Sequence, residues 1–109
     1  MNKYPKVGLD TSGPWREDRE GQKFGYPWNE ITRVTVAALD LKTHKEKTIE
    51  FDHESGHFLE MNSAWVGFTD VIEKLSDFLP VKEESKKKLK YLEPTDDFIT
   101  LWVRADYPQ

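Results

Sequence analysis

Residues 48–61 read Thr-Ile-Glu-Phe-Asp-His-Glu-Ser-Gly-His-Phe-Leu-Glu-Met. Apolar side chains occupy every second position on both sides of the centre, and these are Ile49, Phe51, Leu59 and Met61. A period of two is typical of strands that bury one face. The stretch therefore predicts an antiparallel hairpin with a three-residue loop at residues 54–56, in which Gly56 adopts the left-handed conformation that glycine tolerates best.

The centre of this stretch also spells the His-Glu-x-x-His signature of zinc proteases, through His53, Glu54 and His57. In such a site the two imidazoles lie one helical turn apart, and the glutamate activates a metal-bound water. The strand period of the flanks argues against a helix, so we expect His53 and His57 to be neighbours across a hairpin, with no cofactor. A metal-dependent hydrolase using His53 and His57 is the alternative, with Asp52, Glu54 or Glu60 completing the ligands.

Composition narrows the classes of function. The 109 residues suit one domain, and 33% charged residues indicate a soluble protein. The chain has no cysteine, which removes disulfides, thiol nucleophiles and cysteine-based zinc sites and fits a reducing, cytoplasmic setting. A net charge of -4 argues against nucleic-acid binding, and no apolar run is long enough for a signal peptide or a membrane span.

The N-terminal fourteen residues contain glycine and proline without periodicity, so we expect a flexible arm over residues 1–14 and a single domain over residues 15–109. A short polar hairpin is predicted from Trp15 to Tyr26, with Gly21 at its turn. Further strands are predicted around residues 34–41, 46–53 and 57–61, and a last strand over Phe98–Arg104.

Between these strands, helical spacing of apolar residues predicts a long amphipathic helix from Asn62 to Leu79, which Pro80 ends. A second, more polar helix is expected at the surface from about Lys82 to Leu92. The predicted fold class is α+β: a single antiparallel sheet of about five or six strands, packed by one long amphipathic helix, with a second surface helix and a C-terminal strand.

Two stretches carry a resemblance to a known group of proteins. They are Trp28-Asn29-Glu30-Ile31-x-x-Val34 and, after the helix end at Leu79-Pro80, the strand Phe98-Ile99-Thr100-Leu101-Trp102-Val103-Arg104. Over residues 15–104 the chain resembles a family of small bacterial α+β proteins of unestablished function, which look remotely like pleckstrin-homology domains. The strand after the helices departs from the pleckstrin-homology order. Some small proteins of this look serve as immunity factors for bacterial toxins, so the resemblance implies an immunity-like role.

Aromatic residues suggest binding to a partner protein. Four tryptophans are more than one covered sheet face needs, and tryptophan is enriched at the centres of interfaces. Strand alternation would place Trp102 and Phe98 together on the face opposite Leu101, and with Trp15 they form the candidate interaction face. Cover by the N-terminal arm is the other possibility. We therefore expect a non-enzymatic protein-interaction module with an unknown protein partner.

Overall fold

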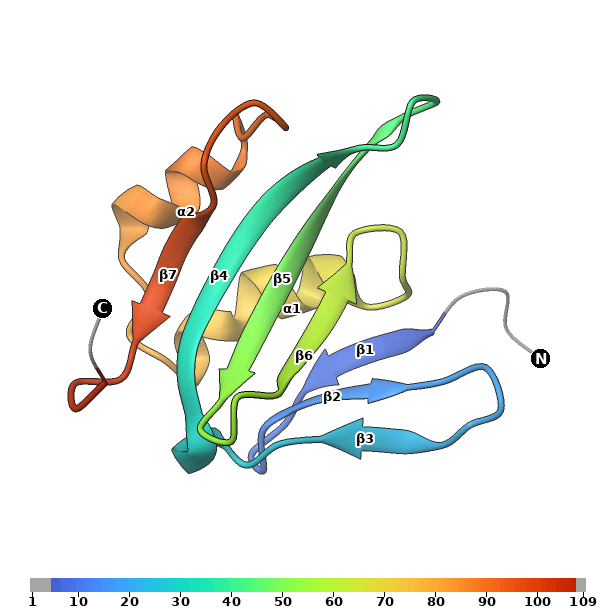
Figure 1. Cartoon of the computed structure of the whole chain (residues 1–109). Helices are drawn as coiled ribbons and strands as arrows, with labels where there is room; N and C mark the ends of the chain where they lie inside the picture. The colour runs from blue at the N-terminus through green and yellow to red at the C-terminus, as the bar shows by residue number, and fades with distance from the viewer. Residues whose placement is uncertain (1–4, 108–109) are drawn as a thin grey trace.

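Antiparallel strands form two sheets in this chain. The computed structural model describes residues 5–107. Its elements are, in order, β1 (Lys6–Leu9), β2 (Pro14–Glu17), β3 (Lys23–Gly25), η1 (Trp28–Glu30), β4 (Ile31–Asp40), β5 (Lys45–His53), β6 (Phe58–Asn62), α1 (Phe68–Lys74), η2 (Leu75–Asp77), α2 (Glu83–Leu89) and β7 (Ile99–Val103). The small sheet has the order β1-β2-β3 and the large sheet β6-β5-β4-β7 (Figure 1).

The predicted fold class, a single sheet packed by one long helix, is wrong. The structure has two sheets, of three and four strands, and its helices are short. The long helix fails at its N-terminal end because Asn62 still belongs to β6 and its Oδ1 accepts the Ala64 amide hydrogen in a turn. Gly67 then has a φ of 96°, which no helix contains, so α1 begins only at Phe68.

The second sheet comes from the N-terminal residues. The predicted hairpin around Gly21 is present as β2 and β3, and Gly21 has a φ of 89°. Residues 6–9, expected in a flexible arm, instead form β1 and pair with β2, and residues 1–4 of that arm lie outside the described part. Pro27 cannot donate to a ladder and precedes the 3₁₀ turn η1, so the chain leaves the small sheet here and enters the large one.

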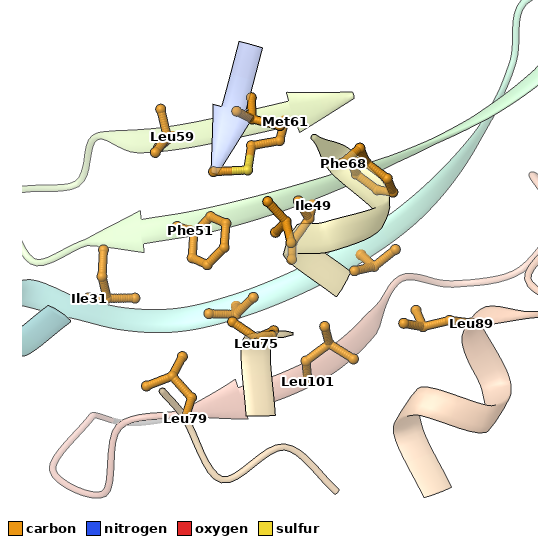
Figure 2. Packing of buried hydrophobic residues seen from close by; sticks show 14 of the residues in the cluster. Ile31, Ile49, Phe51, Leu59, Met61, Phe68, Leu75, Leu79, Leu89 and Leu101 are labelled. Carbon is orange, nitrogen blue, oxygen red and sulfur yellow. The ribbon is translucent and has the colours of Figure 1, made fainter. Parts of the chain in front are cut away.

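The core lies on one face of the large sheet. The predicted β5–β6 hairpin is confirmed: Ile49 pairs with Met61 and Phe51 with Leu59, and all four side chains are at most 1% exposed. Figure 2 shows these four side chains gathered with Phe68 and Leu75 from the helical segment. α1 lies across this face, and in Figure 1 no helix lies in front of the opposite face.

Contact between β1 and the loop before α1 joins the two sheets. The Val7 amide donates to the carbonyl of Val66 at 2.8 Å, and Val7 is buried in the core. A Cβ on Gly67 would lie 2.2 Å from the carbonyl oxygen of Val7. Glycine is therefore required at position 67 by the backbone conformation and also by the closeness of β1.

Among residues 5–107, no helix is long and apolar enough to cross a membrane.

We predict that Gly67→Ala lowers the free energy of unfolding by at least about 3 kcal/mol, because β1 would have to move. Gly56→Ala is the matched control: Gly56 has a similar φ of 93°, but nothing lies within 4 Å of its added Cβ. The control should cost only about 1 kcal/mol, from the left-handed backbone alone. Urea unfolding of both variants measures the difference, and equal costs would show that the contact with β1 does not matter.

Candidate functional site

The His-Glu-x-x-His stretch forms the tip of the β5–β6 hairpin and not a helix. The His53 amide donates to the carbonyl of His57 at 2.8 Å, and Gly56 has the left-handed φ of 93° predicted for it. His53 and His57 therefore face each other across the hairpin, as the alternation of apolar residues predicted. The helical spacing that a zinc protease needs is not present at these residues.

Both nitrogens of the His53 ring are engaged within the protein. Nδ1 accepts the Ser55 amide hydrogen at 3.0 Å, so the proton of the neutral ring is on Nε2, which lies 2.7 Å from Oε1 of Glu30. The ring also stacks on Tyr26, with centroids 4.2 Å apart. These contacts give His53 a structural role that connects the hairpin tip to η1 and to the end of β3.

Glu54, which would be the general base of a zinc protease, is also occupied. Its Oε2 accepts a hydrogen bond from Nη1 of Arg104 at 2.8 Å, and the same nitrogen donates to the carbonyl of Asn29. Across residues 5–107, no group of three or more histidine, aspartate or glutamate side chains could hold a metal ion. Of the residues in the hydrolase alternative, His53 and Glu54 are thus used to fix the hairpin tip, and Asp52 is paired with Arg33.

The opposite side of the large sheet, which we call the open face, is polar and uncovered by helices (Figure 1). Its residues alternate along the strands with core residues such as Val34, Phe51 and Leu59. The open face includes Arg33, Thr35, Ala37, Thr48, Glu50, Asp52, Phe58, Glu60, Phe98 and Thr100. Three carboxylates and one guanidinium on this face make it acidic.

Glu50 is the most perturbed group on the open face. The pKa of its carboxyl is raised from 4.5 to about 7, chiefly because the neutral acid shares a hydrogen bond with Asp52. Partial burial and the negative charges of Asp52 and Glu60 raise this pKa further, while Arg33 opposes the shift. Arg33 is committed mainly to Asp52, because its Nε lies 3.1 Å from Oδ2 of that residue. Glu50 therefore lacks a cation of its own.

Exposed aromatic rings lie beside the carboxylates. Phe58 is 53% exposed and Phe98 57% exposed, which is high for side chains of this size. The Arg33 guanidinium lies 5.9 Å from the centre of the Phe98 ring. A shallow cavity of about 200 Å³ lies between Arg33, Glu50 and Phe98. Apolar rings next to uncompensated acids are the features expected where a cationic partner docks.

Of the three residues in the predicted interaction face, the structure brings only Phe98 to the open face. A bulge in β7 opposes Val34 to Trp102 and Thr35 to Thr100, which leaves Leu101 as the extra residue. Trp102 is thereby turned onto the core side with Val34, so its predicted shared face with Phe98 is wrong. Among the described residues of the N-terminal arm, 5–14, none covers Phe98, which is 57% exposed.

Trp15 lies in the other sheet. Its ring packs on Gly8, where an added Cβ would be 2.4 Å from Cζ2 of the indole, and Nζ of Lys23 lies 4.3 Å from the ring centre. Glu50 was missed as a candidate residue, and Asp52 and Glu60 were considered only as metal ligands and not as members of an acidic binding face. The spacing of two between Glu50 and Asp52, in a strand next to Glu60 in the partner strand, is a signal from which the acidic cluster could have been predicted.

Comparison with protein-family profiles, with curated proteins and with solved structures found no match.

We predict that His53→Ala lowers the free energy of unfolding by about 1–3 kcal/mol, because it removes the contacts with Tyr26 and Glu30. His57→Ala, at an exposed position, should change it by less than about 0.5 kcal/mol. Thermal unfolding with and without excess zinc tests the alternative role. Midpoints should not move with zinc; a rise in the wild type that is lost in His53→Ala would contradict the structural role.

A raised pKa makes Glu50 a source of pH-dependent instability. The folded state holds this proton more tightly than the unfolded state, so stability falls as pH rises from about 4.5 to 7. Glu50→Gln mimics the neutral acid and should be more stable than the wild type by about 1 kcal/mol at pH 8, a figure reduced for solvent screening, and by much less at pH 5. Urea unfolding at both pH values measures this.

Glu83→Gln, at an exposed position on α2, is the control and should show the same small change at both pH values. A stabilisation by Glu50→Gln that is equal at pH 5 and pH 8 would mean that the proton on Glu50 is not responsible.

Proposed function

We propose that this protein acts by binding a partner protein with a basic surface on its open face, and that it is not an enzyme. The observation that carries this proposal is the acidic cluster of Glu50, Asp52 and Glu60, which Arg33 compensates mainly at Asp52 and which lies between two exposed phenylalanines. Arg33 forms its ion pair with Asp52, so a cation from the partner could pair with Glu50 instead. The rings of Phe58 and Phe98 offer apolar contact beside that charge.

Other features support the same choice of partner. An acidic face repels the phosphates of nucleic acid, which favours a protein partner. The engagement of His53 and Glu54 inside the hairpin tip supports a binding role over hydrolysis. The absence of cysteine supports a reducing, cytoplasmic setting. The immunity-like role suggested by the resemblance to small bacterial proteins would be one case of this proposal, in which the basic partner is a toxin.

Titration of the ¹⁵N-labelled protein with an octa-arginine peptide tests the proposal. We expect the largest shifts in the amide resonances of Glu50, Asp52, Phe58 and Phe98, because these residues surround the acidic cluster. Glu50→Gln combined with Glu60→Gln should weaken peptide binding roughly 3- to 10-fold. Phe98→Ala should weaken it a further few-fold, through loss of the cation–π contact.

The matched control is Glu83→Gln combined with Glu84→Gln, which removes the same charge from the exposed surface of α2. It should weaken binding less than about 2-fold, because only the overall field changes. An equal loss for both double variants, or shifts spread over every acidic surface, would mean that the peptide responds to net charge and that the open face is not a binding site.

A further inference from the structure

A groove separates α1 from α2 on the side of the large sheet away from the open face. α1 packs against β1 and α2 against β7, so the two helices do not pack along each other. The groove has a volume of about 310 Å³, and its floor is formed by Val36, Phe68 and Leu89, all of which are buried. Phe68 and Leu89 lie at the same end of the core cluster (Figure 2). This volume is at the small end of the range for sites that bind small molecules.

Lysines surround the mouth of this groove without acidic partners. Lys47 reaches it from β5, Lys86 from α2, and Lys90 from the position that directly follows α2. Within residues 5–107 none of these three forms an ion pair, whereas Lys88 on the same helix pairs with Glu84. Lys47 and Lys86 are half-buried. An anion bound between these ammonium groups would accept charge-assisted hydrogen bonds from them.

From the apolar floor and the unpaired lysines we infer that the groove binds a small anionic amphiphile, a medium-chain aliphatic carboxylate. The aliphatic chain would lie on Phe68 and Leu89, and the carboxylate would accept hydrogen bonds from the ammonium groups of Lys47 and Lys86. Glu73 of α1 also lines the groove and repels an anion from that side, which directs the carboxylate toward the lysines. The site is independent of the open face and of the function proposed for it.

Titration with octanoate, followed by ¹⁵N NMR on the whole chain, tests this inference. Resonances of Val36, Lys47, Ile72 and Leu89 should shift with a Kd of about 0.1–1 mM, as expected for a ligand of so few atoms. The neutral analogue 1-octanol should bind at least roughly 5-fold more weakly, and octylammonium more weakly still, because both lack the negative charge.

Variants separate the groove from a general attraction to the basic helix. Lys86→Gln combined with Lys90→Gln should weaken octanoate binding roughly 5-fold, while Lys87→Gln combined with Lys88→Gln, on the same helix but outside the groove, should leave it nearly unchanged. Glu73→Gln should tighten binding about 2-fold. Thr69→Phe fills the groove from an exposed position and should abolish the shifts while the protein stays folded.

Each contrary outcome overturns the inference. Absence of shifts at the groove, equal binding of octanoate and 1-octanol, or equal loss in the two lysine double variants would mean that no carboxylate site exists there. Binding that survives Thr69→Phe would place octanoate elsewhere, and shifts confined to the open face would identify that surface as the one that attracts apolar chains.

Discussion

Burial of one side of the β4–β5 pair is the constraint on which the rest of the structure depends. Val34, Val36, Ile49 and Phe51 come from the two central strands and are at most 1% exposed. Full burial of such side chains stabilises a protein by about 1.5–3 kcal/mol each. This gain favours the packing of α1 and β1 over them. Within residues 5–107 the helices and β1 lie on this side of the sheet, so polar residues occupy the other side, and the acidic cluster around Glu50 lies there.

The sequence allowed the β5–β6 hairpin to be predicted because local patterning and tertiary burial agree there. Apolar residues alternate on both sides of Gly56, and no competing period is present. The helix prediction failed at its start. The helical spacing of residues 64–68 competes there with a turn, in which Asn62 accepts the Ala64 amide hydrogen, and with the left-handed backbone of Gly67. Of the apolar positions that do lie in α1, Phe68 and Val71 are buried and Ile72 is partly buried, as their spacing indicated.

Other parts could not be predicted because they depend on distant contacts. β1 follows Pro5 and contains Gly8, and it is held by pairing with β2 and by the Val66 carbonyl, which lies far along the chain. The bulge at Leu101 reverses the direction of Trp102 and is set by register against β4. The spacing of Glu50 and Asp52 on the open face could be read from the sequence. The exposure of that face could not, because it depends on where the helices dock.

The pairing of β7 with β4 has a consequence for the newly made chain. β4 is an inner strand, yet one of its two neighbours is β7, the last strand within residues 5–107, and Arg33 pairs with Val103. During synthesis, one hydrogen-bonding edge of β4 therefore stays unpaired until β7 has left the ribosome. Nascent chains would expose that edge beside apolar Val34 and Val36, so chaperone capture or strand pairing between neighbouring polysomes would compete with completion of the sheet.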